Sequence, residues 1–152
     1  SRRFCFYVKI DNKRNDKNYL GGIKMSLTIA CATDDGEKFI SRHFGDADYY
    51  YIYKIDEEKS EFITKINNTS VEEEKHADPK KAKSIVSILK EKNVNCGVSC
   101  AFGPNIKRVK KHIVPVIMKE EDMKDGIQKL VDNFKSLEKS WNEGKNREHL
   151  KM

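Results

Sequence analysis

Cysteine and histidine are the side chains that could bind a metal in this sequence, and their spacing limits the kind of site. The cysteines are Cys5, Cys31, Cys96 and Cys100, and no two of them form a CxxC pair. A strand between Cys96 and Cys100 would separate them by about 13 Å, so they cannot bind one small metal ion together. Cys31 falls in a predicted strand and is expected in the core. The sequence therefore predicts no all-cysteine site, and a reducing cytosol would keep these thiols free.

His43 lies in the segment SRHFGDADYYYIYKID, where a short loop runs into an aromatic strand. We expect Phe44 to anchor this loop in the core and Gly45 to adopt an unusual backbone angle. The loop would then present Arg42 and His43 outward together. A neutral imidazole beside a cation suits an anionic metal cluster. The alternative is a solvated or hydrogen-bonded loop histidine without a ligand.

A second candidate segment is CAFGPN, residues 100–105. Gly103 and Pro104 are typical of a helix start, and the free N–H groups and dipole of such a start favour an anion. Cys100 lies at the end of the preceding predicted strand. These three residues could form the other side of a site that includes His43.

Hydrophobic periodicity predicts an α/β chain in the order β-β-β-α-β-α-β-α, with a mixed five-stranded sheet. A hairpin comes first and parallel crossovers follow. Pro115 indicates an edge position or an irregularity in the fifth strand. Strands are expected at 26–33, 48–56, 61–67, 95–100 and 112–118, and helices at 79–92, from Pro104 onward, and from Met123 to Trp141.

The direction of these strands places the candidate residues at one edge of the sheet. The loops 33–48 and 68–78 and the turn 100–105 all lie at the end where the parallel strands terminate. His43, His76 and Cys100 should share this edge, which is where open α/β sheets bind ligands.

Composition and charge indicate one soluble domain with an added basic segment. Hydrophobic residues make up 38% and charged residues 36% of the 152 residues. The segment 1–24 holds seven Lys or Arg and two Asp, which accounts for +5 of the net charge of +6. The rest of the chain therefore gives no electrostatic case for binding nucleic acid. With no membrane span or signal peptide expected, we predict a cytoplasmic protein.

The domain boundaries follow from the same pattern. Residues 1–24 are expected to be a basic appendage that need not be native to the domain, because Met25 opens a clean strand. Residues 25–141 should form the α/β domain, and 142–152 a flexible tail.

Three segments together resemble the dinitrogenase iron–molybdenum cofactor biosynthesis family, whose members include NifX- and NifB-type cluster-binding domains. They are MSLTIACAT, ISRHFGDADYYYIYKID and NCGVSCAFGPNIKRVKKHIVPV, within about residues 25–132. The HFG motif before an aromatic strand is the most specific of these features, and the Gly-Pro turn is the second. The chain departs from the family at 99–102, where Ser-Cys-Ala-Phe stands in place of the usual glycines.

The resemblance implies a three-layer, ribonuclease-H-like α/β fold and a non-enzymatic role. The chain would bind, carry or scaffold an iron–sulfur or molybdenum–iron–sulfur cluster, with cofactor-assembly proteins as partners. The resemblance makes His43 the candidate cluster contact. Position at the same edge, not the resemblance, adds Arg42 as a further contact and Cys100 as a second metal ligand, and Phe44, Gly45, Gly103 and Pro104 complete the expected site. Because four nearby cysteines are missing, the cluster would arrive preassembled.

Two other functions stay open from the sequence. The first is a protein-interaction module that uses the edge of YYYIYKI or the basic N-terminal segment. The second is a metal-dependent nuclease of ribonuclease-H-like fold, for which Asp34, Asp35, Asp46 and Asp48 are the available carboxylates.

Overall fold

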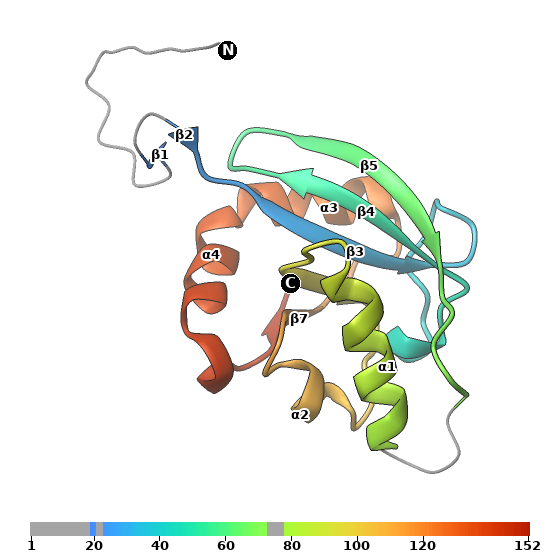
Figure 1. The fold of residues 1–152 in the computed structure, drawn as a ribbon. Helices are drawn as coiled ribbons and strands as arrows, with labels where there is room; N and C mark the ends of the chain where they lie inside the picture. Colours follow the sequence, from blue (N-terminus) through green and yellow to red (C-terminus); the bar gives the residue numbers. More distant parts are fainter. Residues whose placement is uncertain (1–18, 21–22, 73–77) are drawn as a thin grey trace.

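A mixed sheet in the strand order β5-β4-β3-β6-β7-β8 runs through the centre of the computed structural model (Figure 1). The structure describes residues 19–20, 23–72 and 78–152. Within these residues β1 and β2 form a separate two-stranded sheet. The strands are β1 (Tyr19–Leu20), β2 (Ile23–Lys24), β3 (Leu27–Thr33), β4 (Tyr49–Ile55), β5 (Ser60–Asn67), β6 (Cys96–Ser99), β7 (Val114–Ile117) and β8 (Leu150–Lys151).

The predicted hairpin occupies one half of the central sheet and the parallel crossovers the other. β4 runs antiparallel to both β3 and β5, whereas β3, β6, β7 and β8 are parallel neighbours. β4 is therefore an interior strand, and the exposed edge of the hairpin is β5, not YYYIYKI. Tyr50 is fully buried, while Tyr49, Tyr51 and Tyr53 are half-buried.

The helices begin where the sequence provides caps. Asp78 accepts a hydrogen bond from the backbone N–H of Lys80, and Pro79 occupies the first helical turn. Asp122 caps the next long helix through the N–H of Asp125. The helices are α1 (Pro79–Lys90), α2 (Ile106–Val109), α3 (Met123–Asp132) and α4 (Phe134–Asn142), with short 3₁₀ turns η1 (Phe44–Asp46) and η2 (Gly144–Asn146).

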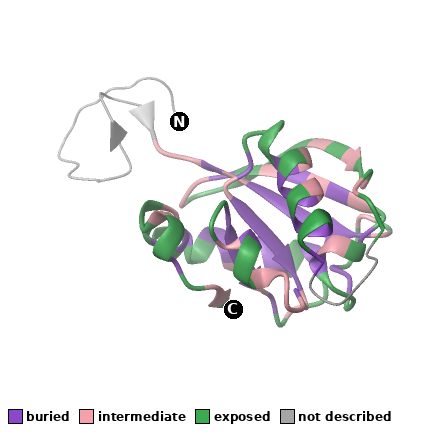
Figure 2. Ribbon diagram, turned by 60° about the horizontal axis from the view of Figure 1, so that its bottom comes forward, coloured by how far each residue is buried: buried purple, intermediate pink, exposed green. Residues whose placement is uncertain are grey.

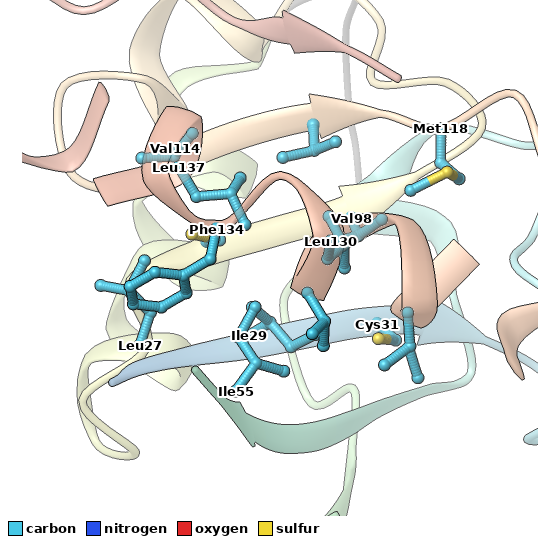
Figure 3. Close-up of a cluster of buried hydrophobic side chains, with 14 of the residues drawn as sticks. Leu27, Ile29, Cys31, Ile55, Val98, Val114, Met118, Leu130, Phe134 and Leu137 are labelled. Atoms are coloured by element: carbon cyan, nitrogen blue, oxygen red, sulfur yellow. The ribbon is translucent and has the colours of Figure 1, made fainter. Parts of the chain in front are cut away.

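Two hydrophobic layers fix the helices to opposite faces of the sheet, as the buried strands between exposed helical surfaces in Figure 2 show. The α3/α4 core, drawn in Figure 3, includes Leu27, Ile29, Cys31, Ile55, Val98, Val114, Met118, Leu130, Phe134 and Leu137. The α1/α2 core includes Ala30, Ala32, Phe44, Tyr50, Ile52, Ile85, Leu89, Phe102, Val109 and Ile113. Cys31 and Cys96 both belong to the α3/α4 core, and the core position expected for Cys31 is confirmed.

The end of the chain differs from the prediction in three ways. The helix expected from Met123 to Trp141 is broken at Asn133, where φ is −112° and ψ is 27°. The expected flexible tail 142–152 contains η2 and β8, and β8 pairs with β7 in parallel. The central sheet therefore has six strands rather than five. A two-residue strand is too short to show the alternation by which the other strands are predicted.

Pro115 lies in β7 opposite Gly97 of β6, one residue before the pairing with β8 starts at Val116. Its missing N–H therefore costs no ladder hydrogen bond to β8. Most of the predicted basic appendage, and the loop histidine His76, lie outside the described residues. None of the helices in the described part is long and apolar enough to cross a membrane.

Candidate functional site

Phe44 anchors the loop between β3 and β4 as predicted. Its ring is 1% exposed and stacks on Phe102, with centroids 4.7 Å apart and planes at 9°. The hydroxyl of buried Tyr50 donates a hydrogen bond of 2.9 Å to the carbonyl of Phe44. The HFG segment is thus held to β4 and to the turn after β6 by aromatic packing.

Gly45 serves a different purpose from the one predicted. Its backbone is not in the left-handed region, so the expectation of an unusual angle is wrong. A Cβ at this position would collide with the Cδ1 atom of Ile85 on α1. Glycine therefore allows η1 to lie close to α1, because a larger residue would have to displace the end of the Ile85 side chain.

Asn68 is a structural determinant of this loop that sequence reasoning missed. Its amide Nδ2 donates hydrogen bonds of 2.8 Å to the carbonyls of both Gly45 and Ala47. These partners lie more than twenty residues away along the chain. No local sequence pattern could have indicated the pairing.

His43 is exposed and joins the two candidate segments. Its backbone forms a parallel bridge with Ala101, which confirms that the HFG loop and the turn 100–105 share one edge. Its imidazole lies directly on Gly103, where a Cβ would be only 2.5 Å from the Nδ1 atom. Gly103 also has a φ of +74°, which side chains other than glycine rarely adopt. The position of the His43 ring therefore depends on Gly103.

A recess of about 20 Å³ lies beside His43, between η1, α1 and the turn before α2. This volume holds about one water molecule, so the recess cannot enclose a metal cluster. Its lining includes His43, Asp46, Lys81, Ile85, Pro104 and Asn105.

Lys81 is the residue of this recess that sequence reasoning overlooked. The residue is only 7% exposed, and its amine makes no hydrogen bond or ion pair within the described residues. A lysine buried to this extent normally extends its amine toward solvent or a partner, and here the opening is the recess. Lys81 lies four residues before buried Ile85, and residues at this spacing share one face of a helix. Helical periodicity could therefore have placed Lys81 on the buried face of α1.

Arg42 is exposed, as is His43, but its guanidinium is bound to other parts of the loop. Its guanidinium makes a two-pronged contact with the Asp34 carboxylate, at 2.8 and 3.1 Å, and donates to the carbonyl of Asp46 at 2.9 Å. Asp34 also accepts a hydrogen bond from the N–H of Asp48. The hydrogen bond from Arg42 lowers the pKa of Asp34, and the same contact raises the pKa of Arg42. The pair ties the two ends of the loop together.

Cys100 lies at the same edge but does not line the recess with His43. Its half-buried side chain packs against the α3/α4 core, whereas Phe102 packs in the α1/α2 core on the other face. Burial and the nearby Glu121 carboxylate raise the pKa of the Cys100 thiol. Its surroundings therefore disfavour the thiolate that binds metals.

The turn at 103–105 leads into the expected short helix, because the N–H of Ile106 donates to the carbonyl of Gly103. α2 begins at Ile106 and has four residues, and Asn105 precedes it without a side-chain cap. So short a helix has little dipole to offer an anion. Pro104 contributes instead to the wall of the recess.

Two of the four carboxylates proposed for a nuclease, those of Asp34 and Asp35, form hydrogen bonds that hold the loop. Asp35 accepts hydrogen bonds from the N–H groups of Glu37 and Lys38, and Asp34 holds Arg42. Within the described residues, no group of three or more His, Cys, Asp or Glu side chains could hold a metal ion. The geometry therefore gives no support to two-metal chemistry.

Comparisons with known proteins agree with the resemblance seen in the sequence. The family model for dinitrogenase iron-molybdenum cofactor matches residues 25–135. A solved structure of a candidate dinitrogenase from Methanocaldococcus jannaschii is similar to this chain with a TM-score of 0.51 and 24% identity, over 71% of this chain and 90% of that one. At this identity the likeness concerns the fold alone. No curated protein matches the chain.

Proposed function

Because the chain belongs to the dinitrogenase iron–molybdenum cofactor family, we propose that it carries a preassembled iron–sulfur or molybdenum–iron–sulfur cluster as cargo. In this role it catalyses no reaction and exchanges the metal cluster with cofactor-assembly proteins. The observation that carries the proposal is the exposed imidazole of His43, fixed on Gly103 beside the recess that contains Lys81.

The chemistry of the donor set fits a metal cluster held at the surface. His43 offers a neutral nitrogen ligand, and the ammonium of Lys81 can balance the negative charge of sulfide-bridged metals. Since the recess has room for about one water molecule, the metal cluster would lie over it rather than within it.

The other proposed contacts have supporting roles. Phe44, Gly45, Gly103 and Pro104 hold the HFG loop against the turn, and Arg42 closes the loop through Asp34. The geometry favours His43 over Cys100 as the metal ligand, because the thiol packs on the opposite face.

We also infer a ribonuclease-H-like fold and a cytoplasmic location. The hairpin followed by parallel crossovers, with helices on both faces, supports the first inference. The free thiols of Cys31, Cys96 and Cys100 are typical of a reducing compartment and support the second.

Anaerobic loading of the full chain tests the proposal. Wild type, His43→Ala and His112→Ala would be mixed with a preformed cluster, iron–sulfur or molybdenum–iron–sulfur, and passed through gel filtration before metal analysis. His112 is also an exposed histidine, but it does not line the recess. We expect the wild type and His112→Ala to retain metal, and His43→Ala to bind about tenfold more weakly.

Two results would contradict the proposal. Equal retention of metal by all three proteins would show that His43 does not contribute to cluster binding. Loss of retention in every protein, including wild type, would leave no cluster-carrying role and favour a protein-interaction module.

A further inference from the structure

A groove of about 590 Å³ lies between α1 and α2 and shares no lining residue with the recess at His43. Both helices pack on the same face of the sheet, as Figure 1 shows, but α2 has only one turn. The short helix covers less of this face than α1 does, which leaves space between them. Pro79, Ala82 and Val86 of α1 supply apolar parts of the lining.

The groove is strongly one-sided in charge. Its charged or ionisable lining residues are Lys83, Lys90, Arg108, Lys111 and His112, and none of the lining residues is acidic. The amines of Lys83, Lys90 and Lys111 form no ion pair within the described part of the chain. Burial and the neighbouring positive charges, led by Lys90 and Lys111, lower the pKa of His112. Within the described part of the chain, the charges of these three lysines are thus not balanced by carboxylates.

We propose that this groove binds a carboxylate-rich segment of a partner protein. Lys83 and Lys90 of α1 and Lys111, just after α2, can pair with successive carboxylates, and the apolar parts of the lining can contact aliphatic side chains between them. Single-stranded nucleic acid is the other polyanion to consider, but it needs aromatic rings on which bases stack. No aromatic residue other than the imidazole of His112 lines the groove.

Fluorescence anisotropy with a labelled peptide of alternating glutamate and leucine tests this inference on the full chain. The test variant is Lys90→Glu with Lys111→Glu. The control is Lys124→Glu with Lys139→Glu, which changes the net charge equally on the exposed surface of α3 and α4. Lys90 and Lys139 both lie in the last turn of their helices, so the helix-dipole effects are matched.

We expect the groove variant to bind the peptide about tenfold more weakly than wild type, and the control to stay within about twofold. A Lys90→Gln, Lys111→Gln protein, checked for folding by circular dichroism, should show a smaller loss in the same direction. An equal loss in the control would mean that binding reflects net charge, which overturns the proposal. Tighter binding of a single-stranded RNA than of the peptide would overturn it too.

The inference stands apart from the cluster-carrying role. The groove variant should load metal as wild type does, while His43→Ala should bind the peptide as wild type does. Failure of one proposal therefore leaves the other testable.

Discussion

Two features of the structure favour glycine at position 103. Its backbone is in the left-handed region, and the imidazole of His43 occupies the space that a Cβ would need. Gly144 has only the first feature, because its φ is +67° and nothing lies within 4 Å of the point that an alanine methyl group would occupy. Comparing alanine substitutions at the two glycines therefore distinguishes the effect of backbone strain from the effect of displacing His43.

We predict that Gly103→Ala and Gly144→Ala each lower the free energy of unfolding by about 1–2 kcal/mol. Only Gly103→Ala should also reduce metal retention, because its methyl group must move the His43 ring. Urea unfolding and cluster loading of both proteins would check this. Full retention by a folded Gly103→Ala protein would show that the ring position is unimportant.

Lys81 should affect binding and stability in opposite directions. The aliphatic part of the Lys81 side chain is largely buried and its amine makes no hydrogen bond or ion pair among the described residues, so the apolar replacement Lys81→Met should not lower stability. The same change removes the positive charge at the recess, and we predict about tenfold weaker cluster binding. Lys83→Met, on the exposed surface of the same helix, is the control. Unchanged binding by Lys81→Met would rule out an electrostatic role for this residue.

The pair of Asp34 and Arg42 makes stability depend on pH. Arg42 lowers the pKa of Asp34 in the folded state. The pair therefore stabilises the folded protein at pH values above the usual pKa of an aspartate side chain. That contribution is lost as pH falls through the lowered pKa. The melting temperature of Asp34→Asn should therefore differ most from wild type at about pH 7 and converge with it toward about pH 3. A difference that stays constant over this range would contradict the assignment.

At the scale of elements, Arg147 holds the last strand to the domain. It is 3% exposed, and its guanidinium donates to the carbonyls of Lys110, Ser140 and Trp141. The segment before β8 is thereby fixed to the end of α4 and to the residue after α2.

We predict that Arg147→Met destabilises the protein by about 2–3 kcal/mol, because one buried and two part-buried carbonyls lose a charged donor. Amide hydrogen exchange should rise first at Met152, whose N–H bonds to the carbonyl of Ile117. Lys145→Met, an exposed change in the same segment, should leave exchange unaltered. Normal protection at Met152 in Arg147→Met would show that β8 is held by other contacts.

For the whole molecule, strand direction correctly predicted that the HFG loop and the turn after β6 lie side by side. Alternating hydrophobic residues located the hairpin and the parallel strands, and the crossover rule then brought His43 to the turn after β6. The pairing of β8 with β7 and the hydrogen bond from Asn68 to Gly45 join residues that are distant in the sequence. Local sequence patterns could not predict them. Cys100 is separated from the recess because successive side chains after β6 point to opposite faces of the sheet, and that of Cys100 points to the α3/α4 core. Strand direction predicted the edge at which Cys100 lies but not the face.

Helix α1 connects the two proposed sites. Lys81 and Ile85 face the recess, whereas Lys83 and Lys90 line the groove. A partner segment in the groove would therefore contact the same helix that, in the proposed function, would supply positive charge to the metal cluster. This arrangement suits a carrier that must meet donor and acceptor proteins.

The most direct test of the central claim is to detect the bond between His43 and the metal cluster. Wild type and His43→Ala, both containing nitrogen-15-labelled histidine, would be loaded with a paramagnetic iron–sulfur cluster and studied by electron–nuclear hyperfine spectroscopy. The account predicts a histidine nitrogen coupling in wild type that is absent from His43→Ala. The same coupling in both proteins, or a loaded wild type without any histidine coupling, would contradict it.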